Sequence, residues 1–252
     1  MAFTVSAVHI ENLNFHYTKD SGVHFQDFSL SVAEYDRFGL FGPNGAGKST
    51  LMNLMTGILH AQNGSVKLFG TDIQRDHRKS NYRIFGFVPQ EFSFYQELSP
   101  LENLEFFGAW YGLSAKQTKT VSEELLGVLG LTHVQHKPVG LFSGGMKRRV
   151  NLAIGVMHKP RLLFLDEPTV GVDVQTRHAI IDYLRQLNKE GMTLVYTSHQ
   201  LNEAEDLCEN VALIDQGRII AKDRLDVLCK EYEQEGLEGL FLQLTGKAYR
   251  DM

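Results

Sequence analysis

Cysteine is scarce in this chain of 252 residues, which contains only Cys208 and Cys229. Their spacing matches neither a zinc-binding motif nor a thiol redox motif, so neither chemistry is indicated. The ten histidines are scattered along the chain without clustering. A chain with so few thiols is typical of a reducing compartment, and we expect a cytoplasmic setting.

A large excess of charge and a long apolar segment are also missing. The net charge is −5, which indicates no general attraction to nucleic acid or to an anionic membrane. The longest segment without charged residues, Ser49–Val66, is interrupted by polar side chains and is not a membrane span. The N-terminus has neither a basic region nor a cleavage site, so we expect no signal peptide. If the protein works at a membrane, another chain must supply the spans.

The composition is that of an ordinary globular protein, with 43% hydrophobic and 22% charged residues. A chain of this length can bury a substantial core in one large domain or two small ones. Neither a repeat nor a low-complexity linker divides it. We therefore expect one nucleotide-binding unit with a helical insertion from about Pro89 to Lys159.

Hydrophobic periodicity predicts strands and helices in the order of an α/β fold. Two antiparallel strands, a short strand, a glycine-rich turn and a helix come first, and strand–helix alternation returns after residue 160. The expected strands lie at 7–17, 23–33, 36–42, 64–70, 161–167 and 192–199, with helices at 99–112, about 114–130 and 174–191. A hairpin should turn at Gln216–Gly217. Ser99 and Glu102 are placed as a capping box at the start of the first middle helix.

The segment GPNGAGKST (Gly42–Thr50) fits the pattern G-x-x-x-x-G-K-[ST] between a predicted strand and a predicted helix. Glycines expose backbone N–H groups to phosphates, Lys48 reaches the outer phosphates and the Ser49 hydroxyl can ligate Mg²⁺. The dipole of the following helix adds to this attraction. The alternative, a glycine turn that matches by chance, is weakened by the strand and helix on either side.

The strand RLLFLDE ends in two carboxylates, Asp166 and Glu167. Asp166 suits the orientation of Mg²⁺ and its water. Glu167 is then placed to polarise the attacking water as a general base or positioning group. By itself an acidic pair at a strand end is usually a solvated edge or a helix cap, and the phosphate loop makes the functional interpretation the favoured one.

The functional interpretation of three further residues depends on the motifs around them. Gln90 and His199 each follow an apolar strand, where a polar residue is most often a satisfied strand terminus. Tyr17 lies 25 residues before Gly42 and could stack on adenine, as bases stack on aromatic side chains. A half-buried tyrosine of the sheet is nearly as good an interpretation.

The segment FSGGMKRRV places three cations, residues 147–149, in the first turn of a predicted helix. The start of a helix carries partial positive charge, so cations there are normally unfavourable. Ser143 is a good N-cap, and Gly144 and Gly145 leave their backbone N–H groups open to an anion. An anion at this point would offset the cations, although a capped helix with a solvated basic face is the simpler alternative.

These motifs stand in one order: GPNGAGKST, Gln90, FSGGMKRR, RLLFLDEP and His199. This order resembles the ATP-binding subunit of ABC transporters over about the whole chain. The resemblance implies an α/β fold, a P-loop NTPase core with a RecA-like, mostly parallel sheet, an N-terminal antiparallel β subdomain and an α-helical subdomain inserted at about 89–159. The ATP-binding domain would span residues 1–225, and a short C-terminal tail residues 226–252.

The resemblance also implies a role for each motif residue. ATP would be bound by Tyr17, Gly42, Pro43, Asn44, Gly45, Ala46, Gly47, Lys48, Ser49 and Thr50. The catalytic residues would be Glu167, His199, Lys48 and Gln90, and the Mg²⁺ ligands Ser49, Gln90 and Asp166. Ser143, Gly144 and Gly145 would act on the ATP of a second, head-to-tail subunit, and Asp173 in PTVGVD matches the family's inter-subunit loop.

The implied cofactors are ATP and Mg²⁺, and the implied partners are a second nucleotide-binding subunit, in a homodimer, and an integral membrane permease, with no nucleic acid. The chain would sit at the cytoplasmic face of the membrane through the permease. Phe142 and Met146 depart from the family's commonest signature, Leu-Ser-Gly-Gly-Gln, and the loss of the glutamine removes one contact. The ending LEGLFLQLTGK and the helical region look like exporters of drugs, lipids or polysaccharides.

Two other functions stay open at this point. The first is an ABC-type ATPase of a soluble assembly, such as an iron–sulfur scaffold system. The second is an ATP-gated clamp that binds without turnover, against which Lys48, Asp166, Glu167 and His199 all argue.

Nine of the 26 aromatic residues fall between Phe85 and Tyr111. They are either the core of the helical insertion or a groove for a helix of the permease.

Overall fold

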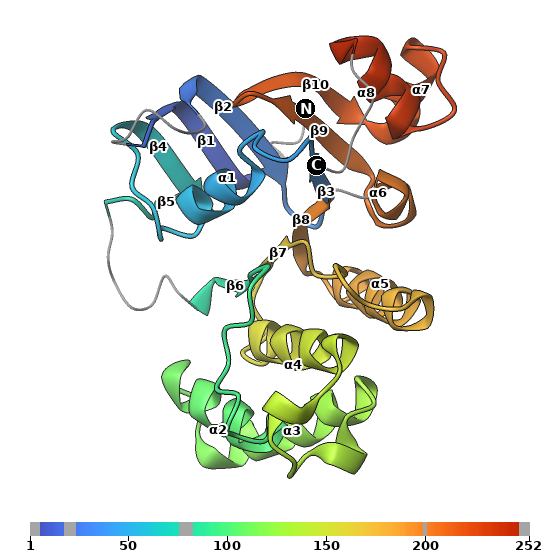
Figure 1. The fold of residues 1–252 in the computed structure, drawn as a ribbon. Coiled ribbons are helices and arrows are strands. Elements are labelled where there is room, and N and C mark those ends of the chain that lie inside the picture. The colour runs from blue at the N-terminus through green and yellow to red at the C-terminus, as the bar shows by residue number, and fades with distance from the viewer. Residues whose placement is uncertain (1–5, 18–23, 76–82, 199–200, 247–252) are drawn as a thin grey trace.

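The computed structural model describes residues 6–17, 24–75, 83–198 and 201–246 (Figure 1). For residues 202–204 it describes the backbone alone. The fold is α/β with two sheets and an inserted group of helices, as expected from the sequence. His199 lies outside the described residues.

The larger sheet is mostly parallel and has the strand order β10-β9-β3-β8-β7-β6. Its strands are β3 (Arg37–Phe41), β6 (Phe85–Val88), β7 (Leu162–Asp166), β8 (Thr193–Ser198), β9 (Asn210–Asp215) and β10 (Arg218–Arg224). Every residue of β7 and β8 is buried, as the continuous apolar segments predict for parallel strands covered on both faces. The β9–β10 pair is the expected hairpin around Gln216–Gly217.

The smaller sheet is antiparallel, with the order β2-β1-β4-β5. Its strands are β1 (Ser6–Phe15), β2 (Phe25–Ala33), β4 (Asn63–Leu68) and β5 (Thr71–Asp72). Helix α1 (Lys48–Met55) follows β3, and its Leu51, Met52, Leu54 and Met55 pack in one apolar cluster with this sheet. The same cluster contains Phe38 of β3 and Phe164 of β7, so α1 packs against both sheets.

The inserted helices form a separate group below the sheets in Figure 1. They are α2 (Pro100–Trp110), α3 (Ala115–Val128) and α4 (Gly144–Val156), with short 3₁₀ turns η2 (Thr132–Val134) and η3 (Val139–Leu141). The capping box of Ser99 and Glu102 is confirmed, because each side chain bonds to the other residue's backbone N–H. Ser114 and Gln117 form a second box at the start of α3.

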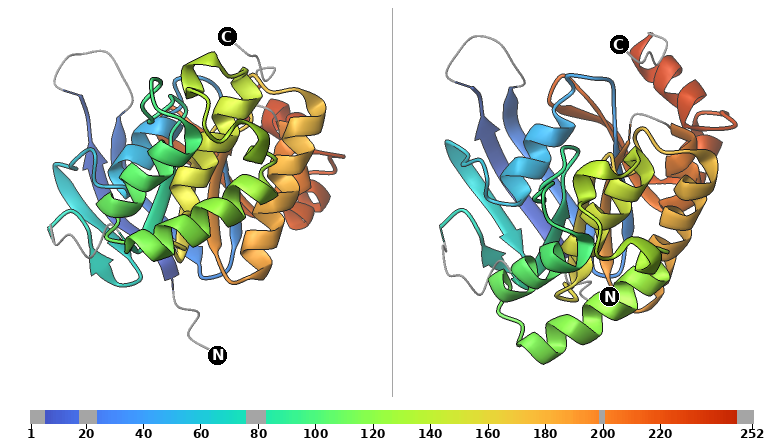
Figure 2. Two further views of the ribbon diagram at one scale, coloured as in Figure 1. Left: turned by 90° about the horizontal axis from the view of Figure 1, so that it is seen from below. Right: turned by 60° about the horizontal axis from the view of Figure 1, so that its bottom comes forward.

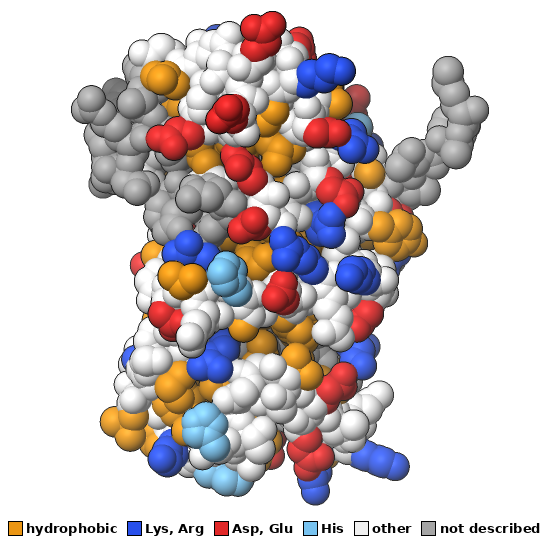
Figure 3. Space-filling view, turned by 90° about the vertical axis from the view of Figure 1, so that its right-hand side faces the viewer, with side chains coloured by type: hydrophobic (Ala, Val, Ile, Leu, Met, Phe, Trp, Pro, Cys, Tyr) orange, Lys and Arg blue, Asp and Glu red, His pale blue; other side chains and the backbone are white. Residues whose placement is uncertain are grey.

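The remaining helices of the described residues are α5 (Val174–Lys189), α6 (Leu201–Leu207), α7 (Leu225–Glu231) and α8 (Leu237–Thr245). Figure 2 shows them on the side of the molecule opposite the antiparallel sheet. Leu228, Leu237 and Leu240 belong to the same apolar cluster as α4 and β8, so α7 and α8 pack onto the core. The face that these helices present carries acidic and basic side chains in a mixed pattern (Figure 3).

Candidate ATP-binding and hydrolysis site

The phosphate loop, residues 42–47, connects β3 to α1. Gly45 and Gly47 have positive φ angles of 80° and 109°, a backbone conformation that favours glycine. A Cβ on Gly42 would lie 2.0 Å from the carbonyl oxygen of Ile214, so only glycine fits there. The backbone N–H of Gly217 donates to the carbonyl of Ala46 over 3.0 Å. This hydrogen bond therefore ties the phosphate loop to the β9–β10 hairpin.

The start of α1 is suited to an anion. Gly47 is the N-cap and provides no side-chain hydrogen bond, and the first turn holds no acidic side chain. Uncapped N–H groups at a helix start attract phosphate. The Ser49 side chain is exposed at this point. These features fit the phosphates of a nucleotide, which is the ligand that the sequence predicts.

Lys48 is almost fully buried, with 5% of its surface exposed. Its Nζ donates to the carbonyl oxygens of Gly42, over 2.7 Å, and Pro43, over 3.2 Å. Burial lowers the pKa of Lys48, while the nearby charges of Glu167 and Asp166 act in the opposite direction. The amine is thus bonded to carbonyls of the phosphate loop and close enough to the two carboxylates to feel their charge.

The acidic pair lies at the carboxyl end of β7. Strand β8 separates β7 from β3, the strand that leads into the phosphate loop. Asp166 is 5% and Glu167 6% exposed, so neither is the solvated edge that was the alternative. The Thr197 hydroxyl donates to Oδ1 of Asp166 over 2.6 Å across the β7–β8 ladder. Glu167 has a φ of 49°, uncommon for a residue with a side chain. Strain of this kind is found preferentially at functional sites.

Gln90 contacts the acidic pair from the side of the neighbouring strand β6. It follows β6, and its Nε2 donates to Oε2 of Glu167 over 2.9 Å. The parallel β6–β7 pairing brings the carboxyl ends of both strands to the same edge of the sheet. Two residues that are 77 positions apart in the sequence therefore meet at one carboxylate.

The SGG segment begins α4. The Ser143 side chain caps the helix by accepting from the backbone N–H of Met146 over 3.3 Å, and both Ser143 and Gly144 are exposed. A Cβ on Gly145 would lie 3.2 Å from Cγ2 of Thr176 at the start of α5. Gly145 thus allows the two helix starts to approach closely.

Two of the cations that follow have partners inside the chain. Arg148 donates to the carbonyls of Gln90 and Val170. Arg149 donates from Nη1 to the carbonyl of Leu129, at the end of α3, over 2.8 Å. No anion is therefore needed to offset the charges of these two side chains, since backbone carbonyls provide the negative partial charge.

Asp173 is the N-cap of α5. It accepts from the backbone N–H and the hydroxyl of Thr176, over 2.9 and 2.7 Å, and these bonds lower the pKa of Asp173.

Tyr17 lies beside the first turn of α1, where its hydroxyl is 3.1 Å from the hydroxyl of Thr50. With 40% of its surface exposed, the Tyr17 ring is available for stacking at the mouth of the loop.

Sequence patterns did not identify Thr197 or Arg148 as parts of this site. Thr197 is one threonine within a buried strand, and only the strand pairing places it opposite Asp166. Arg148 stood out by its charge at a helix start, which was the available signal, but its partners are far away in sequence.

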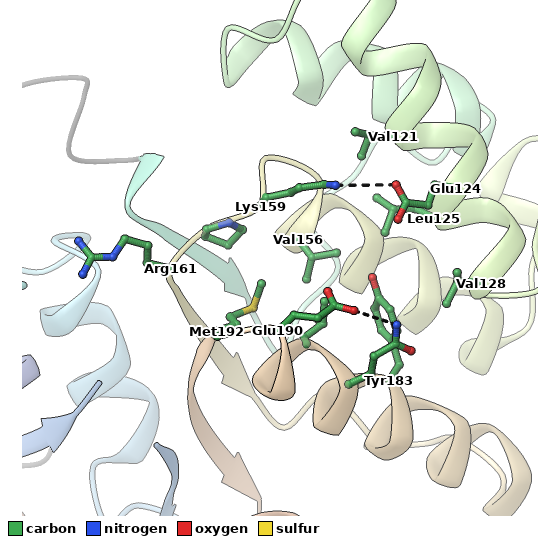
Figure 4. Close-up of a pocket in the computed structure, with 14 residues that line it drawn as sticks. Val121, Glu124, Leu125, Val128, Val156, Lys159, Arg161, Tyr183, Glu190 and Met192 are labelled. Atoms are coloured by element: carbon green, nitrogen blue, oxygen red, sulfur yellow. Dashed lines mark hydrogen bonds and ion pairs between the residues drawn. The ribbon is translucent and has the colours of Figure 1, made fainter. Parts of the chain in front are cut away.

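A separate cavity of about 300 Å³ lies between α3, α5 and the segment before β7 (Figure 4). Lys159 and Glu124 form an ion pair of 3.9 Å across it, and Gln186 donates to Glu190 over 2.9 Å. None of the residues assigned to the binding of ATP or Mg²⁺ lines it. This cavity is therefore distinct from the phosphate loop and the acidic pair.

Among the described residues, no helix is long and apolar enough to cross a bilayer. Within the same ranges, no three His, Cys, Asp or Glu side chains form a group that could hold a metal ion. A Mg²⁺ ion at Asp166 and Ser49 would thus need oxygen ligands from a bound nucleotide, as is usual for this ion.

Comparison with known proteins agrees with this site. The family model described as ABC transporter matches residues 25–170. The linearmycin resistance ATP-binding protein LnrL of Bacillus subtilis is 43% identical over 219 residues, which are 87% of this chain and 70% of that protein. The Nod factor export ATP-binding protein I of Bradyrhizobium diazoefficiens is 38% identical over 206 residues, 82% of this chain and 67% of that protein.

A solved structure described as an ATP-binding subunit of an ABC transporter superimposes with a TM-score of 0.86 at 26% identity, covering 95% of this chain and 100% of that one. The chain belongs to the ABC transporter family. It is an ATP-binding subunit of the exporter type that hydrolyses ATP to energise transport, so the soluble-assembly and non-hydrolysing alternatives are set aside.

Proposed function

We propose that this chain works as one of two identical subunits that meet head to tail, bind ATP and Mg²⁺ between them, and drive a separate membrane permease. The observation that carries the proposal is the meeting of Lys48, Asp166, Glu167 and Gln90 at one edge of the parallel sheet. The bounds proposed for the ATP-binding unit remain residues 1–225, with the helical insertion at about 89–159.

Within one subunit, the phosphate loop of Gly42–Thr50 would bind the phosphates through its backbone N–H groups and the start of α1. Lys48 would turn from the carbonyls of Gly42 and Pro43 to the outer phosphates, an exchange of one set of oxygen acceptors for another. Tyr17 would stack on the adenine, at the exposed position where its hydroxyl meets Thr50.

Ser49, Asp166 and Gln90 would hold Mg²⁺, directly or through water. A bound Mg²⁺ supplies positive charge to the phosphate oxygens in phosphoryl transfer. Asp166 is already oriented by the Thr197 hydroxyl, which donates to one carboxylate oxygen and leaves the other available. The donor set of one hydroxyl, one amide and one carboxylate suits a hard cation that keeps phosphate and water ligands.

Glu167 would accept a proton from the attacking water or orient it. Its Oε2 is held by Gln90, so the carboxylate has one defined position before a nucleotide arrives. We propose His199 as the group that contacts the γ-phosphate on the Lys48 side. His199 lies outside the described residues, so the support for this role is its position directly after the buried strand β8.

Ser143, Gly144 and Gly145 would complete the site of the second subunit, and Asp173 would contact it across the interface. The support is their exposure: Ser143 and Gly144 are open to solvent at the start of α4, where a helix end attracts phosphate. Two copies related by a twofold axis would each supply a phosphate loop and a signature segment.

The permease is proposed to dock on the inserted helices. Phe106 and Trp110 are 43% and 77% exposed on α2, and Tyr95 is 48% exposed nearby, while Phe94 is buried. The aromatic cluster thus contributes to both the core of the insertion and its surface. Because relatives are named for linearmycin resistance, daunorubicin resistance and Nod factor export, we propose an amphiphilic natural product as the class of exported substrate.

The test is to tag the full chain in its own host, solubilise the membrane and identify the integral protein that co-purifies. Phosphate release is then measured on that complex and on a complex carrying Lys48→Met. We expect the substitution to reduce turnover by about 100-fold or more, because a principal electrostatic contact to the phosphates is lost. Co-purification with a soluble scaffold, or equal turnover in the two complexes, would overturn the proposal.

A further inference from the structure

Arg148 is a buried cation whose partners are all neutral. Only 7% of its surface is exposed, and among the residues that the structure describes it forms no ion pair. Its guanidinium donates to two backbone carbonyls and lies 4.8 Å over the ring of Phe92. Burying a charge without a direct ion pair is costly, so the arrangement indicates a role that a neutral residue could not perform as well.

Each hydrogen bond of Arg148 ends beside the acidic pair. Nη1 donates to the carbonyl of Gln90, and the side chain of the same Gln90 holds Glu167. Nε donates to the carbonyl of Val170 over 3.3 Å, and the backbone N–H of Val170 donates to the carbonyl of Glu167 over 3.3 Å. One guanidinium thus contacts the backbone on both sides of the Gln90–Glu167 hydrogen bond.

A second residue of α4 holds the same segment. Asn151 lies three positions after Arg148, on the same face of the helix. It is 1% exposed, its Nδ2 donates to the carbonyl of Pro89 over 3.1 Å, and its Oδ1 accepts from the backbone and hydroxyl of Ser93 over 3.3 and 3.1 Å. Segment 89–93 is therefore bonded to α4 at three of its residues, Pro89, Gln90 and Ser93.

We propose that Arg148 and Asn151 are positioning residues, a clamp through which helix α4 fixes residues 89–93 and thereby places the Gln90 side chain on Glu167. The inference rests on the proposed roles of Glu167 and Gln90 in hydrolysis. Because Ser143–Gly145 begin the same helix, a shift of that helix end moves the clamp and changes the alignment of the catalytic carboxylate.

Burial lowers the pKa of the Arg148 side chain, and the charges of Glu167 and Asp166 oppose that change. The guanidinium is thus close enough to both carboxylates to interact with their charge. Its fork geometry lets it serve two carbonyls at once, which an ammonium group on a lysine stem cannot match. Arg148→Lys therefore keeps the charge and removes the geometry.

The test compares Arg148→Lys with Arg161→Lys, a matched control outside the site. Arg161 also stacks on a ring, that of Phe69 at 3.8 Å, and donates to a single oxygen of Glu34. In the complex of the full chain with its permease, Arg148→Lys should lower kcat about tenfold or more, with the KM for ATP within about twofold of wild type. Arg161→Lys should leave both parameters unchanged.

Non-additivity separates positioning from a general loss of structure. Gln90→Ala should reduce kcat in the wild-type chain and have little further effect in Arg148→Lys, because both changes break the same arrangement. Fully additive losses, or a kcat of Arg148→Lys within about twofold of wild type, would overturn the clamp. Glu167→Gln is measured in parallel: if it alone abolishes turnover while Arg148→Lys does not, the proposed function stands and the clamp fails.

If Arg148→Lys does not fold, Phe92→Leu replaces it. Phe92 is 37% exposed, so its loss is tolerable for folding, and it removes the ring beneath the guanidinium. Amide hydrogen exchange of the full chain supplies a readout without turnover. Peptides covering residues 89–93 and 167–171 should exchange faster in Phe92→Leu than in Arg161→Lys, and equal exchange would count against the clamp.

Discussion

The side-chain amide of Gln90 donates a hydrogen bond to Oε2 of Glu167 over 2.9 Å. The two residues follow neighbouring parallel strands, and the bond holds the carboxylate at the edge of the sheet where the phosphate loop also lies. A carboxylate fixed in this way is suited to orient a water molecule.

Glu167→Gln should keep ATP binding and reduce turnover by at least about 100-fold, because an amide cannot accept the proton of the attacking water. The same variant should accumulate as an ATP-bound dimer, which size-exclusion chromatography with and without ATP would detect. Glu97→Gln, an exposed residue away from the motifs, is the control. Turnover at the wild-type rate in Glu167→Gln would show that another group activates the water.

Ser143→Arg tests whether the signature segment acts on the partner's nucleotide. In mixed dimers, one subunit carries Ser143→Arg and the other Lys48→Met. Only one composite site then contains both defects, and the other site is intact. About half of the wild-type turnover is the most that one site can give if sites act independently. If Ser143 acted within its own subunit, both sites would be damaged and turnover would fall to the level of the homodimeric variants.

Stability should fall as the solution is acidified, because of His158. Burial lowers its pKa to about 4, while its Nε2 lies 3.0 Å from the carbonyl of Phe85. The unfolded chain binds a proton near the ordinary pKa of 6.5, so the stabilisation is complete above that pH and is lost progressively down to about pH 4. The loss from this group is at most about 3 to 4 kcal/mol, since the pKa is lowered from 6.5 to about 4 and one pKa unit corresponds to about 1.4 kcal/mol.

Urea unfolding at about pH 7.5, 5.5 and 4.5, which span this pH range, would measure the effect. His158→Gln keeps a donor for the Phe85 carbonyl and removes the titrating ring. Its free energy of unfolding should depend less on pH than that of the wild type. Parallel curves for the two proteins would mean that other groups cause the acid sensitivity.

Two capping boxes allow a matched comparison in the helical insertion. Ser99 is 4% exposed and Ser114 is exposed, yet both side chains accept from the backbone N–H three residues later over 3.3 Å. Ser99→Ala and Ser114→Ala should each lower the free energy of unfolding by about 1 kcal/mol, with the larger loss at buried Ser99. Thermal unfolding would measure this, and a larger loss at Ser114 would contradict it.

Much of this fold could be predicted because its signals are local. The buried strands β7 and β8 are continuous apolar segments, the capping box of α2 lies within four residues, and the phosphate loop needs only nine consecutive residues. Each of these features depends on neighbours in the sequence, where propensity and hydrogen bonding act directly. The residue classes of the ATP site follow from the same local patterns.

Local sequence patterns establish the class of fold and the chemistry available at each motif. The tertiary structure alone decided which motifs meet. Arg148 looked like a misplaced charge at a helix start until the sheet brought the carbonyls of Gln90 and Val170 to its guanidinium. Thr197 similarly acquired a partner in Asp166 only through strand pairing. Such contacts join residues 22 to 58 positions apart, and sequence patterns over short windows carry no information about them.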